Sequence, residues 1–203
     1  DIGVTPAIIL NKADLLDQLP AEEQKEMPEV LTMYRNIGYR VETVNALQPE
    51  SAQPVRELLV DRCSIVVGQS GVGKSSLVNA LMPHINADVG AISGGSGLGQ
   101  HTTTVATRYE VPTGGVLIDS PGIREFALWH LEPERVAWCY IDFRPYLGQC
   151  KFRDCKHLDD PGCALQEACQ AGDLHELRLY NYHKIIESMA LKPSRATTRG
   201  KKA

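Results

Sequence analysis

Apolar and polar residues alternate along residues 1–125 in two different patterns. Short apolar runs rich in β-branched residues are typical of buried strands, and longer stretches with apolar residues on one face are typical of helices. The short runs predict strands at residues 6–10, 40–44, 64–67, 104–111 and 116–118. The longer stretches predict helices at residues 22–36 and 74–81. This alternation indicates an α/β domain with a mostly parallel sheet and helices on both faces.

The pattern changes near residue 131, where helical segments surround a group of cysteines. We therefore expect an α/β domain at residues 1–130, a small α-helical domain at 131–191 and a tail at 192–203. The tail contains no acidic residue and no apolar periodicity, so it is expected to be disordered in isolation. It could serve as a solubilising tail or as an arm that neutralises RNA phosphates.

Composition and charge narrow the class of protein. Of the 203 residues, 43% are hydrophobic and 23% are charged, as in soluble globular proteins. No apolar run is long enough to span a bilayer and the chain has no leader pattern, so we expect a cytoplasmic protein without a membrane partner. Because the chain begins with Asp1 instead of Met, we also expect a fragment of a longer protein.

The charge is unevenly distributed. Residues 1–143 contain 10 Lys and Arg against 18 Asp and Glu, whereas residues 144–203 contain 11 against 7. The basic C-terminal part can face an anionic partner, although an ordinary solvated surface explains it equally well.

Residues 68–75 read G-Q-S-G-V-G-K-S, directly after an apolar run and at the start of a predicted helix. This context favours a phosphate-binding loop over a structural glycine turn. The glycines let backbone N–H groups converge on phosphate oxygens. Lys74 is expected to reach the β and γ phosphates, and the Ser75 hydroxyl is expected to ligate Mg²⁺.

Two further motifs follow predicted strands. Residues 11–14 read N-K-A-D, in which Asp14 can accept two hydrogen bonds from guanine, Asn11 can contact its O6/N7 edge and Lys12 can cover the base. The same four residues also suit a helix start capped by Asp. Residues 119–122 read D-S-P-G, in which Asp119 can hold the Mg²⁺ shell and the Gly122 amide can meet the γ phosphate. Alone, this second motif is also a common turn.

The order of the motifs is unusual, because N-K-A-D, the motif that would recognise the base (the base reader), precedes the phosphate loop. Cutting and rejoining a compact α/β domain at neighbouring termini leaves its spatial contacts unchanged. If the motifs serve one site, the chain is therefore circularly permuted. A P-loop kinase fits less well, since N-K-A-D specifies the base and no acceptor site is visible.

With these motifs the sequence resembles the circularly permuted, small-ribosomal-subunit-dependent GTPase family (RsgA, also called YjeQ or YloQ). The resemblance rests on N-K-A-D, the phosphate loop, S-G-L-G-Q-H-T-T-T, D-S-P-G-I-R-E-F and C-K-F-R-D-C-K-H-L-D-D-P-G-C-A. It implies an N-terminal OB-fold, a permuted P-loop G domain and a C-terminal zinc domain. The chain starts after the OB-fold and after the strand and helix that would precede N-K-A-D, so the sheet is expected to lack a strand.

The resemblance also implies a function: Mg²⁺-dependent hydrolysis of GTP to GDP in late maturation of the small (30S) ribosomal subunit, stimulated by that subunit. The implied partners are GTP or GDP, the subunit and its rRNA, and the expected state is a monomer. The motifs and the resemblance together assign the following residues to the nucleotide: Asn11, Lys12, Asp14, Asn45, Ala46, Gly68, Gln69, Ser70, Gly71, Val72, Gly73, Lys74, Ser75, Ser76 and Gly122.

Catalysis requires a group that orients water. Ile123 follows D-S-P-G and cannot form a hydrogen bond to water through its side chain. By resemblance, His101 is the water-orienting residue, acting with Lys74, and Thr103 is a further Mg²⁺ contact. Alternatively, His101 is an exposed loop histidine and Ile123 packs under the loop. If turnover is negligible, the protein is instead a guanine-nucleotide-gated RNA-binding module.

Four of the six cysteines fall between residues 150 and 169. Cys150, Cys155, His157 and Cys163 provide three thiols and one imidazole within a short loop, a set suited to one structural, tetrahedral Zn²⁺. A disulfide pair is the alternative, and it is less favoured in a cytosolic chain. Cys169 and His183 are expected to be ordinary core or surface residues.

Overall fold

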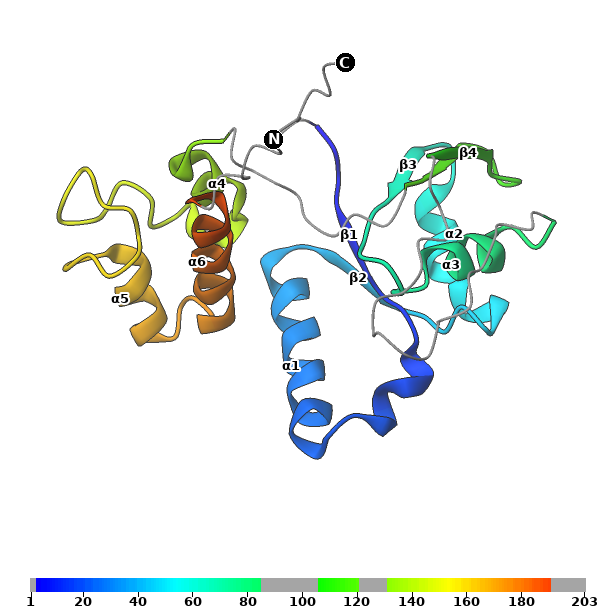
Figure 1. Cartoon of the computed structure of the whole chain (residues 1–203), viewed down its shortest axis with the longest axis horizontal. Coiled ribbons are helices and arrows are strands. Elements are labelled where there is room, and N and C mark those ends of the chain that lie inside the picture. Colours follow the sequence, from blue (N-terminus) through cyan, green and yellow to red (C-terminus); the bar gives the residue numbers. More distant parts are fainter. Residues whose placement is uncertain (1–2, 85–105, 121–130, 191–203) are drawn as a thin grey trace, which may run out of the picture. The chain divides into compact units, whose positions relative to one another are not determined.

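The computed structural model describes residues 3–84, 106–120 and 131–190. The chain divides into two compact units, Ile2–Phe126 and Ala127–Ala203, and each is described by itself. Figure 1 labels their helices and strands. His101, Thr103 and Gly122 lie outside the described residues, and so does the tail at 192–203. Among the described residues, no helix combines the length and the apolar character needed to span a bilayer.

The first unit begins with a β-α-β segment. Strand β1 (Ala7–Leu10) pairs in parallel with β2 (Arg40–Thr43), so that Ala7 lies opposite Arg40. Between them lie the 3-10 helix η1 (Ala13–Gln18) and helix α1 (Ala21–Ile37). Helix α1 ends at Gly38, whose φ of 106° favours glycine. Figure 1 shows β1 and β2 side by side, with α1 connecting them through η1.

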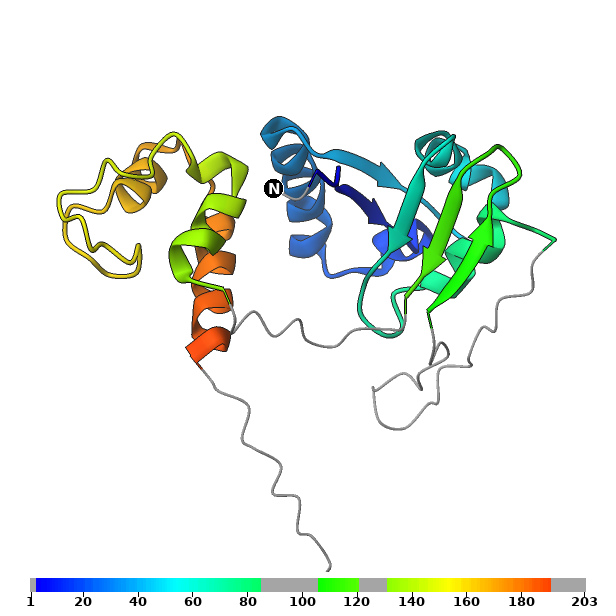
Figure 2. The same cartoon turned by 90° about the horizontal axis from the view of Figure 1, so that it is seen from above.

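A second sheet contains the other three strands, in the order β3 (Cys63–Val66), β5 (Val116–Asp119) and β4 (Thr107–Glu110). Strand β5 is parallel to β3 and antiparallel to β4, and Figure 2 shows the three strands side by side. The pattern of the sequence predicts one mostly parallel sheet, whereas the described strands form two. Strand β1 has no ladder with β3 in the described residues, so each of these two strands is an edge.

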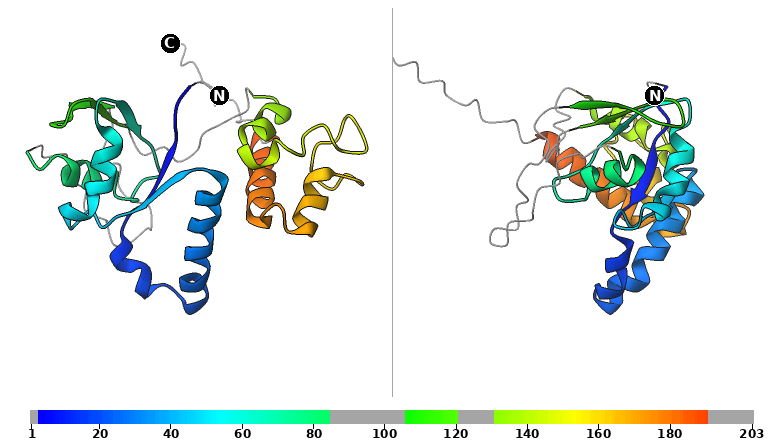
Figure 3. Two further views of the ribbon diagram at one scale, coloured as in Figure 1. Left: turned by 180° about the vertical axis from the view of Figure 1, so that it is seen from behind. Right: turned by 90° about the vertical axis from the view of Figure 1, so that its right-hand side faces the viewer.

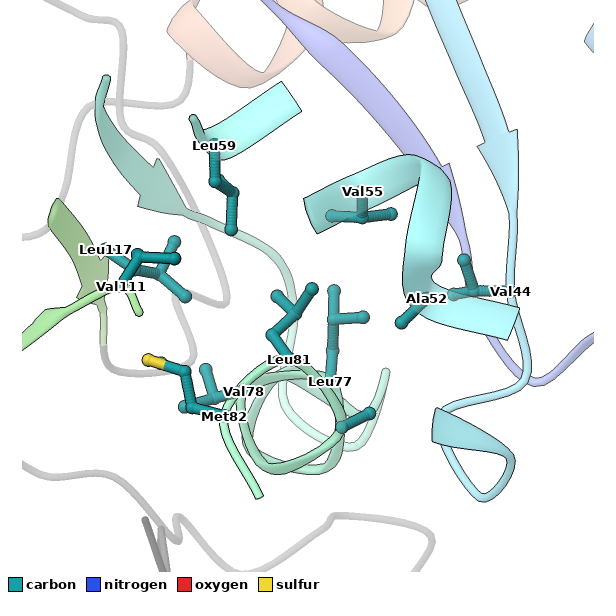
Figure 4. Packing of buried hydrophobic residues seen from close by; sticks show 11 residues of the cluster. Val44, Ala52, Val55, Leu59, Leu77, Val78, Leu81, Met82, Val111 and Leu117 are labelled. Carbon is teal, nitrogen blue, oxygen red and sulfur yellow. The ribbon is translucent and has the colours of Figure 1, made fainter. Parts of the chain in front are cut away.

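The core of this unit lies on one face of the second sheet. The segment η2 (Pro49–Ala52), helix α2 (Gln53–Leu59) and helix α3 (Lys74–Leu81) contribute to it together with β5. Leu77 and Leu81 of α3 point toward Val55 and Leu59 of α2 (Figure 4). Burying each such side chain stabilises the fold by about 1.5–3 kcal/mol. Because α3 directly follows the phosphate loop, this packing fixes the position of that loop.

The second unit is helical among its described residues. It comprises α4 (Pro133–Cys139), the 3-10 helix η3 (Ile141–Phe143), α5 (Ala164–Ala171) and α6 (Glu176–Ala190). The left view of Figure 3 shows these helices and the long loop that leads into α5. Three aromatic rings form the centre of its core. Tyr140 stacks on Phe143 with centroids 4.5 Å apart, and Tyr182 meets both rings edge-on at 5.8 and 5.6 Å.

An ion pair between Arg178 and Asp142 connects two elements of this core. The guanidinium of Arg178 donates from Nε to Asp142 Oδ2 at 2.9 Å and from Nη2 to Oδ1 at 2.8 Å. The same guanidinium lies 4.4 Å from the centre of the Tyr140 ring. This bidentate geometry joins η3 to α6 and compensates for the burial of both charges.

Candidate functional site

The loop between β3 and α3 has the geometry that the phosphate-loop motif predicts. Gly71 and Gly73 have φ values of 83° and 91°, a backbone region that favours glycine. A Cβ on Gly73 would also collide with the side-chain nitrogen of Asn11. Both glycines are therefore required by conformation, and a Cβ on Gly73 would in addition displace the Asn11 amide.

Lys74 opens α3 and is buried. Its Nζ donates to the carbonyl oxygens of Gly68 at 2.9 Å and Gln69 at 2.8 Å. Burial lowers the pKa of Lys74, while the nearby Asp119 carboxylate opposes this shift. The amine thus lies inside the loop, where the sequence predicts the β and γ phosphates.

The parallel register of β3 and β5 places Asp119 beside the start of this loop. Val66 at the end of β3 is the partner of Asp119 at the end of β5. Asp119 is 1% exposed, and the following Ser120 donates from Oγ to the Val66 carbonyl at 2.6 Å. The proposed Mg²⁺ ligand from D-S-P-G and the phosphate loop therefore meet at one end of the sheet.

Asn11 connects three segments that are distant in sequence. Its Nδ2 donates to the carbonyls of Val72 at 3.1 Å and Gly73 at 3.3 Å, and its Oδ1 accepts from the amide of Ala46 at 3.2 Å. Lys12 donates from Nζ to the carbonyl of Gly71 at 2.7 Å. The structure thus brings together the N-K-A-D motif, the segment at Asn45 and Ala46 and the phosphate loop.

Asp14 lies exposed in the first turn of η1. The residue at the N-cap of η1 is Lys12, with φ 62°, and no side chain caps this helix by a hydrogen bond. N-K-A-D therefore does not act as an Asp-capped helix start here, and the Asp14 carboxylate faces solvent. Asn45 is held by the Ser51 hydroxyl, which donates to the Asn45 carbonyl at 2.6 Å.

The other predicted nucleotide residues follow from their positions in the loop. Gln69 is exposed, whereas Ser70, Ser75 and Ser76 are half-buried at the loop and the first turn of α3. The predicted roles of His101, Thr103 and Gly122 concern residues outside the described part of the chain.

The second unit contains a compact group of possible metal ligands. The Sγ atoms of Cys150, Cys155 and Cys163 lie 3.4, 3.6 and 3.5 Å from Nδ1 of His157. All four ligand atoms lie within 4.8 Å of one another. The six cysteines are all free thiols, so the disulfide alternative is not realised. This arrangement fits a closed tetrahedral Zn²⁺ site.

The electrostatics of this cluster also suit a cation. Burial raises the pKa of Cys155 to about 12 and also raises that of Cys163. Burial lowers the pKa of His157, which favours the neutral imidazole. Three thiols that converge on one imidazole, with Cys163 buried and Cys150 and Cys155 half-buried, would be costly to ionise unless a divalent cation compensated for their charge.

Several supporting residues of this cluster were not predicted. Asp160 Oδ2 accepts from the amides of Lys156 and Leu158, each at 3.2 Å. His183 Nε2 lies 2.7 Å from the carbonyl of His157, whose φ is 60°. The turn residues D-D-P-G at 159–162 could have indicated the role of Asp160. Nothing local in the sequence indicates the contact of His183, because it joins α6 to a loop 26 residues away.

Comparison with known proteins agrees with this geometry. The model of a family described as "RsgA GTPase" matches residues 1–129. Small ribosomal subunit biogenesis GTPase RsgA 1 of Vibrio vulnificus strain YJ016 is 53% identical over 203 residues, which is 100% of this chain and 57% of the relative. The corresponding protein of Shewanella oneidensis is 56% identical over 189 residues, or 93% of this chain and 52% of the relative.

Solved structures of related GTPases also match this chain. YjeQ from Thermotoga maritima matches with a TM-score of 0.68 at 27% identity, covering 94% of this chain and 62% of that one. YloQ, described as a circularly permuted GTPase, matches with a TM-score of 0.68 at 28% identity, covering 93% and 58%. The chain thus spans between half and two thirds of the length of these proteins. With a family model that covers its whole α/β unit and relatives that are more than half identical along it, the chain belongs to the RsgA GTPase family.

Proposed function

We propose that this chain binds GTP at a site assembled from permuted segments and hydrolyses it to GDP and phosphate. The observation that carries the proposal is the position of Asn11, which is bonded at once to the phosphate loop and to Ala46. A base reader and a phosphate loop joined in this way can hold the two ends of one nucleotide. The exposed Asp14 carboxylate supplies the guanine-specific pair of acceptors.

Each end of the nucleotide has its own residues in this proposal. Lys74 binds the β and γ phosphates, and the amides of residues 69–75 surround them. Ser75 and Asp119 would hold Mg²⁺ together with Thr103, and Gly122 would contact the γ phosphate. The cation would neutralise charge that develops on the phosphates. His101 orients the attacking water, because Ile123 lacks a polar side chain.

The biological role is proposed from the relatives. Their names describe small ribosomal subunit biogenesis GTPases, and we propose that this chain acts as a nucleotide switch in late maturation of the 30S subunit. It would do so as a cytoplasmic monomer, with the subunit and its rRNA as partners and stimulators of turnover. Residues 1–130 would form the G domain, residues 131–191 the zinc domain and residues 192–203 a basic tail.

One structural Zn²⁺ is proposed in the second unit. Cys150, Cys155 and Cys163 would hold it through sulfur and His157 through Nδ1, the atom that faces all three sulfurs. The cation would provide much of the stability of a loop that has little apolar content of its own.

The test is GTP turnover by this chain at low salt, with and without purified small ribosomal subunits. Turnover that rises on adding subunits is expected, and replacing His101 by Ala should remove most of it. The competing function, a nucleotide-gated RNA-binding module, is favoured by Ile123 at the position after D-S-P-G. The RNA-binding module predicts GTP-dependent binding to subunits with negligible turnover. Within the favoured function, unchanged turnover in His101→Ala would exclude the proposed role of this histidine.

A further inference from the structure

The loop between Cys150 and Cys155 presents an aromatic ring to solvent. Phe152 is 47% exposed, and its neighbours Lys151, Arg153 and Asp154 are exposed as well. The Nζ of Lys151 lies 5.4 Å from the centre of the Phe152 ring. The ring lies outside the described hydrophobic core of this unit. Packing in the described core of this unit therefore does not explain why a phenylalanine stands at this position.

Several contacts fix the position of this loop. The amide of Lys151 donates to the carbonyl of Gly162 at 3.0 Å, and the Lys151 side chain lies against Gly162. A Cβ on Gly162 would come within 2.8 Å of Lys151 Cβ, and the φ of Gly162 is 72°. The amide of Cys155 donates to the carbonyl of Phe152 at 3.4 Å. The loop has one cysteine of the possible metal-ligand group at each end, Cys150 and Cys155. Its backbone is therefore ordered, and a ligand that binds to the Phe152 ring causes little further loss of conformational entropy.

The charge of the loop differs from that of its surroundings. Residues 131–190 contain 7 Lys and Arg against 10 Asp and Glu, yet residues 150–156 contain 3 against 1. The basic residues of this segment are Lys151, Arg153 and Lys156. An exposed aromatic ring with one cation near it and another next to it in sequence suits unpaired nucleotides, whose bases stack on the ring while their phosphates meet the cations. A regular RNA duplex offers no free base face to such a ring.

We propose that Phe152 stacks on an unpaired base of RNA while Lys151 and Arg153 neutralise the flanking phosphates. This inference rests on the proposed function, in which the small ribosomal subunit is the partner, and it assigns one part of that contact to the loop between Cys150 and Cys155.

The experiment measures binding of a fluorescently labelled, unstructured RNA oligonucleotide and of its duplex by anisotropy at several salt concentrations. The zinc-loaded chain is compared with Phe152→Ala, Phe152→Leu and Phe152→Tyr. Loss of stacking should weaken single-strand binding by about tenfold in the Ala and Leu variants, whereas Tyr retains it. Replacing both Lys151 and Arg153 by Ala should lower the slope of log affinity against log salt by about 1 to 2. Zinc content, measured for every variant, verifies that the loop is intact.

Three results would overturn the inference. The first is single-strand affinity that is equal in wild type and Phe152→Leu, or absent in wild type. The second is a duplex that binds as tightly as the single strand, with neither affinity changed when Phe152 is replaced. The third is loss of small-subunit binding in Phe152→Ala with unchanged oligonucleotide binding, which would indicate a protein contact. Absence of GTP turnover in wild type, measured in parallel, would contradict the proposed function and leave the RNA result to be judged separately.

Discussion

The two units of this chain build their sites in opposite ways. In the first unit, helices packed on a sheet fix the ends of strands and loops, and the residues of the proposed nucleotide site converge because those ends meet. In the second unit, Cys150, Cys155, His157 and Cys163 lie in the long loop before α5 and at its N-cap, and in our proposal a metal bound by this cluster stabilises that loop. If the proposal is right, the first site depends on its fold, whereas part of the fold of the second unit depends on its metal site.

The largest predicted effect follows from this difference. Replacing Cys155 by Ser, or removing zinc with a chelator, should unfold the loop at residues 150–163, because metal binding contributes folding free energy on the order of 10 kcal/mol in small zinc domains. Zinc content and limited proteolysis measure the effect. Cys139→Ser is the matched control, since Cys139 is exposed and lies outside the cluster. A stable loop in Cys155→Ser would show that the cluster does not support the fold.

Lys74 should have the next largest effect. Replacing Lys74 by Ala removes the amine inside the phosphate loop, and turnover of GTP should fall by about 100-fold or more. The free energy of unfolding should fall by about 1–2 kcal/mol, because the two hydrogen bonds from Nζ to the Gly68 and Gln69 carbonyls are lost, so turnover is compared at a temperature at which both proteins are folded. Lys25→Ala, on the exposed surface of α1, serves as the control. Equal turnover in Lys74→Ala and Lys25→Ala would contradict the proposed role of the loop.

Asn11 links site and fold within the first unit, and its replacement should affect both. Asn11→Ala loses hydrogen bonds to Val72, Gly73 and Ala46. Because each bond contributes about 1 kcal/mol, the free energy of unfolding should fall by about 1–3 kcal/mol, and GTP affinity should fall as well. Urea unfolding and nucleotide titration measure the two effects, with the exposed Asn36→Ala as the control. If Asn11→Ala lowers the affinity for GTP but not the free energy of unfolding, Asn11 does not contribute to the stability of the fold.

The smallest effect concerns the second core. Burial raises the pKa of Tyr182 to about 12, from an ordinary value of 10.0. An unfolded chain releases this proton first, so the stabilisation is complete below about pH 10 and is lost as the pH rises toward 12. Tyr182→Phe loses the hydrogen bond from the hydroxyl to the Lys156 carbonyl, which costs about 1 kcal/mol at neutral pH. The difference in unfolding free energy between the two zinc-loaded proteins should shrink between pH 10 and 12, and a constant difference would contradict this account.

Much of the first unit could be predicted from the sequence, because local patterns and motif context decide it. The apolar run at residues 116–118 predicted strand β5, which the structure extends to Asp119, and the glycines of the phosphate loop follow from backbone requirements. The division into two sheets could not be predicted, since periodicity does not specify which strands form a ladder. The links made by Asn11 were also hidden, because they join residues about 60 positions apart.

In the second unit, the sequence predicted which thiols and imidazole could hold a metal, but it did not predict the residues that support them. The sequence predicted Cys150, Cys155, His157 and Cys163 as one group, and the structure adds that Nδ1 is the atom of His157 that faces the three sulfurs. The contact of His183 with the carbonyl of His157 and the ion pair of Arg178 with Asp142 depend on how α6 packs. Such contacts are properties of tertiary structure, and no local pattern indicates them.

The central claim is that permuted segments form one guanine-specific nucleotide site, and nucleotide preference in Asp14→Asn tests it most directly. Guanine presents an N–H and an amine to the Asp14 carboxylate, whereas xanthine has a carbonyl in place of that amine, which an Asn amide can donate to. The account predicts that wild type prefers GTP over XTP and that Asp14→Asn reverses this preference, both measured by competition against labelled nucleotide. Unchanged preference in Asp14→Asn would contradict the claim that N-K-A-D reads the base.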